Sequence, residues 1–219
     1  MFVSLRRFHR CHDVAVSLKP DHLVVCVVDL EAGHDDFADR FGLASIPGGR
    51  HPDHGTANRI VPLGASYIEL VAVVDEAEAS ASPFGSWVGS NALRWSGIDA
   101  VCLRTDDILA IGVRLGIEPV PMSRVKPDGS TLSWQLAGVE HTISEGLPFF
   151  VEWSVPEEDL PGRNAIDHPV GPATLELVEI VGELERLESW VVGVTGVRLS
   201  PGAPSIHATV RSPRGTIQL

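Results

Sequence analysis

A repeated order of predicted elements constrains this chain more than any other feature. DHLVVCVVDL, beginning at Asp21, resembles DAVCLRTDDI, beginning at Asp99, and in both stretches an aspartate recurs eight residues on. Each stretch predicts a strand that leads into a short helix ending at a glycine, Gly42 or Gly116. Further strands follow each helix, and a shorter third copy comes after them. The sequence therefore predicts a strand–helix–strand–strand–strand unit used about three times.

The division of the chain follows from this repeat. We expect an N-terminal extension over residues 1–19, a first βαβββ module over 20–80, a second over 97–156 and a third, degenerate one over 173–219. Consecutive hairpin-like strands predict an α+β fold, with largely antiparallel curled sheets that form a cup and with helices outside it. Residues 83–95 read as an irregular connection, and Lys126–Gly129 as a turn between two strands.

Charge and composition exclude several classes of partner. The chain has 219 residues and a formal net charge of −12, which repels the phosphates of nucleic acids. No apolar run approaches the roughly 20 residues that a membrane helix needs, and the N-terminus lacks the apolar core of a signal peptide. The three cysteines fit no disulfide framework, which favours a reducing cytoplasm. His9, Cys11 and His12 form a short HRCH cluster whose use as a metal site would need a fold around it.

Side-chain alternation suggests where chemistry could gather. Side chains of a strand alternate between its two faces, so His22 and Val28 share a face of the first strand, and Tyr67 and Glu69 share a face of SYIELVAVV. An imidazole and a carboxylate that converge on the concave side are a common beginning of a divalent metal site. The plainer alternative is a histidine that caps its strand and a glutamate that faces water. FVEW in the second unit matches YIEL in the first, which places Glu152 opposite Glu69.

The stretch GGRHPDHGTANRI, from Gly48 to Ile60, is unusually rich in glycine and polar residues. Its first two glycines permit a tight turn. Thr56 and Asn58 alternate with Ala57, so both can face the cup and offer hydrogen bonds. The alternative is that they satisfy backbone groups in a crowded corner, as buried polar groups must.

Taken in order, DHLVVCVVDL, GGRHPDHGTANRI, YIEL and LPFFVEW resemble the glyoxalase-like domain proteins of the vicinal oxygen chelate superfamily. The resemblance covers residues 20–156 well and the tail only as a degenerate further module. It implies paired βαβββ modules whose sheets form a cup around a small ligand. It specifies the activity poorly, because one fold hosts many functions.

The resemblance also implies a set of metal ligands from the first and last strands of the modules. Carried over residue by residue, it makes His22 and Glu69 ligands in the first module and leaves Glu152 in the second, where Ala100 stands at the place of His22. In the third module it places Glu176 and Gln218 at the corresponding positions. Three ligands are thus conceivable, His22, Glu69 and either Glu152 or Glu176, and the incomplete set leaves open a divalent metal ion or no cofactor.

Ligand-binding candidates come from the same resemblance. His51 stands at the family's loop histidine, close to Thr56 and Asn58, and these three would bind the ligand at the mouth of the cup. Independently of the resemblance, Trp134 and Trp153 lie in predicted strands and would suit a planar organic ligand if they line the cup, whereas core packing is their other interpretation. His168 reads as part of a linker.

Two functions follow as expectations. The first is a divalent-metal-dependent lyase or isomerase that acts on a small oxygen-rich substrate through an enolate-type intermediate, with Glu69 or Glu152 moving a proton. Ring-cleaving dioxygenases fit less well, since they need two histidines and a carboxylate. The alternative is a metal-free protein that binds or sequesters a small molecule, and a third reading is a dimer scaffold. A homodimer is expected in each case, since most soluble homo-oligomers are of that kind.

Overall fold

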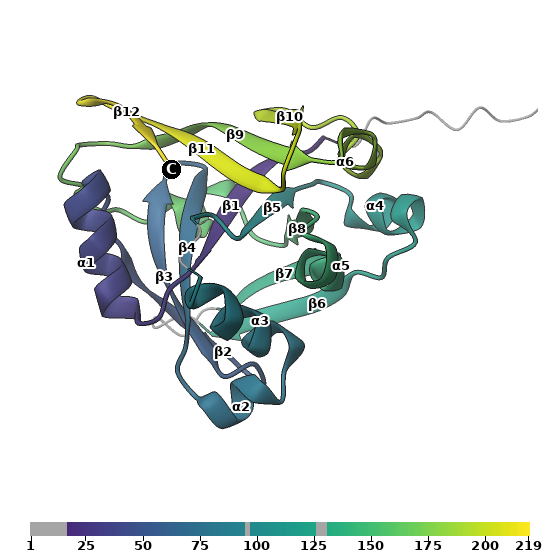
Figure 1. Cartoon of the computed structure of the whole chain (residues 1–219), viewed down its shortest axis with the longest axis horizontal. Helices are drawn as coiled ribbons and strands as arrows, with labels where there is room; N and C mark the ends of the chain where they lie inside the picture. The colour runs from purple at the N-terminus through teal and green to yellow at the C-terminus, as the bar shows by residue number, and fades with distance from the viewer. Residues whose placement is uncertain (1–16, 95–96, 126–130) are drawn as a thin grey trace, which may run out of the picture.

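The first half of the fold is a four-stranded unit with one helix, as the repeat predicts. It consists of β1 (Lys19–Cys26), α1 (Leu30–Phe41), β2 (Ile46–His51), β3 (Thr56–Leu63) and β4 (Ser66–Val73). The computed structural model describes residues 17–94, 97–125 and 131–219 (Figure 1). Helix α1 begins where the Asp29 carboxylate accepts hydrogen bonds from the backbone of Glu31 and Ala32, and it ends at Gly42, whose φ of 65° is left-handed.

The second half repeats this arrangement beside the first. It consists of β5 (Ala100–Arg104), α4 (Ile108–Leu115), β6 (Val120–Val125), β7 (Thr131–Ala137) and β8 (Phe149–Trp153). β5 runs parallel to β8 as β1 runs parallel to β4, and β1 pairs antiparallel with β5 where the halves meet. The result is one curled eight-stranded sheet with the order β2-β3-β4-β1-β5-β8-β7-β6 (Figure 1). The predicted α+β class is confirmed, and the predicted turn at 126–129 lies outside the described residues.

The C-terminal segment has the predicted order of elements but a different pairing. It consists of β9 (Thr174–Gly182), α6 (Leu184–Trp190), β10 (Val197–Pro201), β11 (Ser205–Ser212) and β12 (Gly215–Gln218). Its sheet has the order β10-β9-β11-β12, so the first strand runs parallel to the second rather than to the last. This sheet lies across the outer side of the large one (Figure 1). Its strand positions therefore do not correspond to those of the first two units.

Three short helices occupy segments that the sequence did not assign to helix. They are α2 (Glu76–Ser80), α3 (Pro83–Ala92) and α5 (Val139–Glu145); two single 3-10 turns, Glu157–Asp159 and Pro161–Arg163, follow β8. The irregular connection expected after residue 82 is wrong, because Ser82 caps α3 and Pro83 opens it. Gly138 and Gly146 bound α5, whose seven residues are too few to show a clear helical period.

The two faces of the large sheet carry separate cores. Leu23 of β1 belongs to the same hydrophobic cluster as Phe37 of α1 and Val178 of β9, so the helices that the sequence predicts and the second sheet cover the outer face. Val24 belongs to the other cluster, together with Val88 of α3. The unpredicted helices α3 and α5 thus border the concave face.

The ends of the predicted units are tied into the fold. Leu18 is fully buried and pairs with Val194, so the fold already includes residues 18 and 19 of the expected extension. The HRCH cluster lies outside the described residues. In the segment after β8, His168 is buried, where its Nδ1 accepts a hydrogen bond from the Ala44 backbone and its Nε2 donates to the Pro62 carbonyl. Among the described residues no helix has the length and apolarity that a membrane span needs.

Candidate functional site

A cavity of about 370 Å³ opens on the concave face of the large sheet. Both halves of the sheet line it, and α3 and α5 add residues at its border. Most of the lining is apolar, and it includes six aromatic side chains: Tyr67, Phe84, Trp87, Trp134, Phe149 and Trp153. A volume in this range is typical of sites for small organic molecules.

His22 stands at the polar end of this cavity. Its Nδ1 lies 2.7 Å from Oδ1 of Asp21, so Nδ1 carries the proton and Nε2 faces the cavity. The imidazole stacks on Tyr67 at 4.6 Å and meets the edge of Phe149 at 5.4 Å. A β-bulge between Pro20 and His22 explains how two consecutive residues of one strand reach the same site, since the extra residue shifts the alternation of faces.

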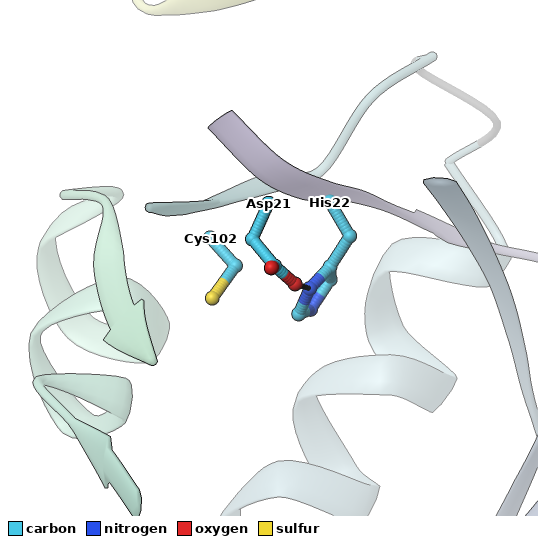
Figure 2. Close-up of side chains that lie close together, drawn as sticks. All are labelled: Asp21, His22 and Cys102. Carbon is cyan, nitrogen blue, oxygen red and sulfur yellow. Dashed lines mark hydrogen bonds and ion pairs between the residues drawn. The ribbon is translucent and has the colours of Figure 1, made fainter. Parts of the chain in front are cut away.

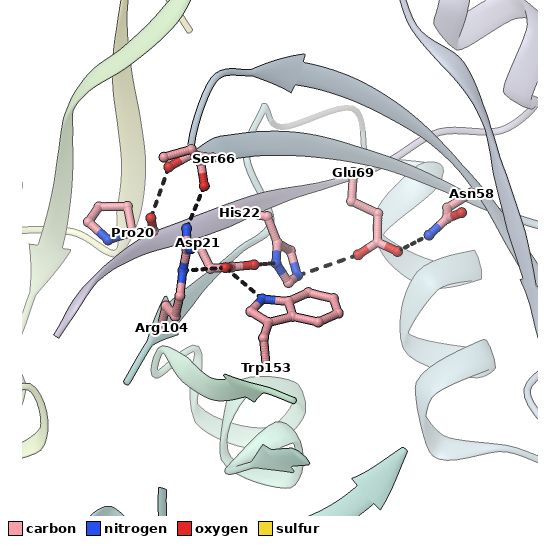
Figure 3. A network of polar contacts seen from close by, with 9 residues as sticks. Pro20, Asp21, His22, Asn58, Ser66, Glu69, Arg104 and Trp153 are labelled. Atoms are coloured by element: carbon pink, nitrogen blue, oxygen red, sulfur yellow. Dashed lines mark hydrogen bonds and ion pairs between the residues drawn. The ribbon is translucent and has the colours of Figure 1, made fainter. Parts of the chain in front are cut away.

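Residues of the second half hold the Asp21 carboxylate from the other side (Figure 3). Oδ2 of Asp21 lies 2.9 Å from Nε of Arg104 and accepts a hydrogen bond of 2.9 Å from Nε1 of Trp153. Arg104 also donates to the carbonyl of Ala65. The contacts with Arg104 and Trp153 hold the Asp21 carboxylate in place, and the fixed carboxylate orients the imidazole of His22.

Glu69 of β4 lies next to His22 in the same cavity wall. Its Oε2 is 3.7 Å from Nε2 of His22, and its Oε1 is 3.4 Å from Nε2 of His51 (Figure 3 shows the contact with His22). Asn58 donates a hydrogen bond of 2.5 Å to Oε1. Burial opposes ionisation of Glu69, but the contacts with His51, His22 and Asn58 outweigh it and lower the pKa of this carboxyl to about 2.

The glycine-rich stretch before β4 positions these contacts. Oδ1 of Asn58 accepts a hydrogen bond of 2.7 Å from the Gly49 backbone, which turns the amide nitrogen toward Glu69. A Cβ at Gly48 would lie 1.9 Å from Oδ1 of Asn58, so only glycine leaves the asparagine in place. Thr56, predicted to bind the ligand, is buried behind the cavity wall and its Oγ1 lies 2.9 Å from Nδ1 of His51. The stretch thus orients the polar end of the cavity.

Glu152 does not reach the cavity, contrary to the expectation. Val24 of β1 pairs with Glu69, whereas Cys102 of β5, the corresponding residue, pairs with Phe149. The residue that corresponds to Glu69 is therefore Phe149 and not Glu152, which lies three residues further along the strand. A shift by an odd number of residues turns a side chain to the opposite face of the sheet. The Glu152 carboxylate instead accepts a hydrogen bond of 2.7 Å from the backbone of Ile108, where α4 begins.

The remaining predicted residues separate into two groups. His51, Asn58 and Trp134 line the cavity, and the ring of Trp134 lies 5.4 Å from that of Trp153. Glu176 and Gln218 belong to the second sheet, where Glu176 pairs with Arg211 and Gln218 with Thr209. Asp21 and Arg104 received no role from the sequence, and Trp153 was expected only to line the cup beside Trp134 or to pack in the core, not to bond to Asp21. Only the recurrence of Asp21 in both units pointed to one of them.

The residues present do not fit the metal centre that the resemblance implies. In the second half, Ala100 and Phe149 occupy the places of His22 and Glu69, and neither offers a ligand atom. Among the described residues, one group of side chains with possible metal ligand atoms lies close together. It consists of Asp21, His22 and Cys102 (Figure 2). Its donors suit a cation poorly, because Asp21 is held by Arg104 and because burial raises the pKa of the Cys102 thiol well above its usual value.

Comparison with known proteins agrees with this fold. Residues 21–195 match a family described as a glyoxalase-like domain. The solved structure of a hypothetical protein from Staphylococcus aureus is 18% identical, with a TM-score of 0.59 over 86% of this chain and 88% of that one. No curated protein matches the sequence.

Methylmalonyl-CoA epimerases are also among the similar structures. The enzyme from Mycobacterium tuberculosis is 23% identical, with a TM-score of 0.43 over 63% of this chain and 89% of that one. A Streptomyces coelicolor variant in complex with 2-nitronate-propionyl-CoA is 18% identical, with a TM-score of 0.44 over 62% of this chain and 97% of that one.

Proposed function

The chain belongs to the glyoxalase-like domain family of the vicinal oxygen chelate superfamily, and from this premise we propose that it moves a proton on a small organic substrate, as a lyase or isomerase does. The observation that carries the proposal is that Nε2 of His22 and Oε2 of Glu69 lie 3.7 Å apart at the polar end of an otherwise apolar cavity. A substrate of that size would be bound by the apolar walls and meet both groups at one end.

His22 is the group that exchanges the proton in this proposal. Asp21 accepts the hydrogen bond from Nδ1, which leaves the lone pair of Nε2 toward the cavity. A carbon–hydrogen bond next to a substrate carbonyl would break, its proton would go to Nε2, and its electron pair would pass to the carbonyl oxygen as an enolate. In a substrate that carries a hydroxyl group on this carbon, transfer of the hydroxyl proton to the enolate oxygen and return of the proton from Nε2 to the former carbonyl carbon would give the isomeric carbonyl compound. The orientation of an imidazole base by a buried carboxylate is a common catalytic arrangement.

Glu69 has the complementary role. A pKa near 2 makes its carboxylate a weak proton acceptor near neutral pH, since effective general bases have pKa values close to the working pH. It can instead accept a hydrogen bond from the substrate and stabilise the imidazolium that forms on His22. Glu152, which faces away, has no part in this proposal.

Two finer versions of the function are a divalent-metal-dependent enzyme and a metal-free binding protein. The metal content of the purified protein and the exchange of substrate protons distinguish them. A divalent-metal-dependent enzyme has only the contact between Asp21 and His22 in its favour, because metal-binding histidines commonly donate their other ring nitrogen to a carboxylate, whereas the second half supplies no further ligand at the corresponding places. A metal-free binding or sequestering protein is supported by the loss of ligand residues in the second half. Elemental analysis of the purified protein tests the metal-dependent version. That version predicts about one equivalent of metal in the wild type and none in His22→Ala.

Proton exchange tests the proposal itself. The probe is 2-hydroxyacetophenone in D2O, whose α-hydrogens are followed by proton NMR. The protein should accelerate their exchange, His22→Ala should abolish the acceleration, and His34→Ala should retain it, because His34 lies on α1 and bonds to Ser45 outside the cavity. If the protein binds the probe but does not accelerate the exchange of its α-hydrogens, the result contradicts the enzyme and supports the sequestering protein.

Assembly and location complete the proposal. Cys26 and Cys102 are buried free thiols, and burial raises the pKa of both, so they stay protonated in a reducing cytoplasm. We propose a cytoplasmic homodimer on this ground and on the prevalence of two-fold oligomers. Sedimentation equilibrium of the full chain measures the second part directly.

A further inference from the structure

The cavity offers an anionic ligand no free cation among the described residues. The charged or ionisable side chains that line it are His22, Arg50, His51, His54, Glu69, Glu118 and Glu140. The guanidinium of Arg50 lies 2.5 Å from the Glu78 carboxylate and 3.5 Å from that of Asp75, and these contacts raise its pKa. Its charge is therefore already balanced. A ligand carboxylate or phosphate would meet glutamates without a compensating partner.

One acceptor at the polar end remains available to a ligand. Oε1 of Glu69 accepts from Asn58, whereas no hydrogen bond from the described residues reaches Oε2. The gap of 3.7 Å between Oε2 and Nε2 of His22 is longer than a hydrogen bond. A buried carboxylate normally accepts several hydrogen bonds, so a donor on the ligand fits this place.

The walls of the cavity complement a flat, apolar body. Phe84 and Trp87 of α3 stack with their planes 23° apart, and Trp134 and Trp153 form a second pair from β7 and β8. Aromatic side chains favour offset or edge contacts with another ring. An aromatic ligand would meet such partners from both the helix and the sheet.

We infer that the cup selects an uncharged, planar aromatic compound whose hydroxyl group donates a hydrogen bond to Oε2 of Glu69, and that it discriminates against anions. This inference rests on the proposed use of the cup as a small-molecule site. The inference adds to the proposed function the class of ligand and the residue, Glu69, that sets the preference for it. The hydroxyl would lie between Glu69 and His22, and the ring would lie against the aromatic pairs.

A matched series of naphthyl compounds tests the inference. The full chain is titrated by calorimetry at neutral pH with 2-naphthol, 2-methoxynaphthalene and 2-naphthoate, which share a ring system and differ in donor and charge. We expect 2-naphthol to bind at least about tenfold more tightly than either of the others, since a hydrogen bond to a carboxylate is worth that factor or more. In Glu69→Gln the preference over the other two compounds should shrink to a few-fold, while Glu31→Gln, at an exposed position outside the cavity, should keep it.

The outcomes separate this inference from the proposed function. Equal affinity for the three compounds, or tightest binding of 2-naphthoate, overturns the inference and leaves the cup as a small-molecule site. If none of the three binds, the inference fails, whereas the proposed function fails only if the protein does not accelerate proton exchange on 2-hydroxyacetophenone. Because the comparison among compounds is made on the wild-type chain, it stands even if Glu69→Gln does not fold.

Discussion

Phe149 on β8 occupies the position in the second half of the sheet that Glu69 on β4 occupies in the first. Each pairs with the residue three places after the aspartate that recurs in both halves: Cys102, after Asp99, pairs with Phe149, and Val24, after Asp21, pairs with Glu69. The polar cluster of the cup therefore exists once, and the second half places an aromatic ring against His22. This asymmetry gives the cavity one polar end and apolar walls.

Loss of the Asp21 charge should destabilise the fold strongly. Asp21 and Arg104 are both buried, so Asp21→Asn would leave the guanidinium without a counter-charge. Removal of one partner of a buried pair costs about 3 kcal/mol or more. Urea unfolding measures this, with Glu31→Gln as the control, because Glu31 is 74% exposed in its pair with Arg59. An equal small effect in both variants would contradict the buried pair.

Acid should weaken the protein partly through Glu69. Its folded pKa of about 2 lies below the ordinary 4.5, so its contribution to stability is present above about pH 4.5 and is lost as the pH falls toward 2. The gap between these pKa values corresponds to about 3 kcal/mol. The difference in unfolding free energy between the wild type and Glu69→Gln should shrink accordingly as the pH is lowered. A difference that does not change with pH would show that Glu69 is not held ionised.

Gly48 should tolerate no side chain, whereas Gly89 should accept one. Gly48→Ala would displace Asn58, for a cost of about 1–3 kcal/mol and weaker binding in the cup. In α3, a Cβ at Gly89 meets only Val73 at 3.5 Å, and alanine favours helix by about 1 kcal/mol. Thermal unfolding of the two variants should shift in opposite directions. A shared direction would contradict the close approach at Gly48.

His168 should stabilise the fold, because its buried side chain joins two backbone segments. His168→Ala would leave the Ala44 backbone and the Pro62 carbonyl without their partner, at a cost of about 1–3 kcal/mol for each buried group. His207 on β11 is exposed and bonds only to Ser205 among the described residues, so His207→Ala is the matched control. Chemical unfolding of both variants checks the difference, and an effect of His168→Ala no larger than that of the control would contradict it.

The sequence predicted the elements that carry strong periodic signals. The strands and the helices that end at Gly42 and Gly116 lie where alternation and glycine stops place them. Helix α3 was missed because glycine and serine dilute its apolar pattern, although Ser82 and Pro83 are a typical helix start. The linker reading of His168 missed its burial, since a single histidine carries no periodicity.

The site was predictable in its first half and not in its second. His22 and Glu69 follow from alternation within one unit, where the register of β1 and β4 is regular. Glu152 failed because short apolar strands can be aligned in several registers, and only pairing decides which face a side chain takes. The network of Asp21, Arg104 and Trp153 depends on a bulge and on contacts across the sheet, neither of which leaves a local pattern.

A crystal structure of the protein soaked with 2-hydroxyacetophenone tests the central claim most directly. The account predicts that the ring lies in the cup against Trp134 and Trp153, with its hydroxyl within hydrogen-bond distance of Oε2 of Glu69 and its α-carbon beside Nε2 of His22. Electron density for the compound at another place, or Glu69 turned out of the cavity in its presence, would contradict it.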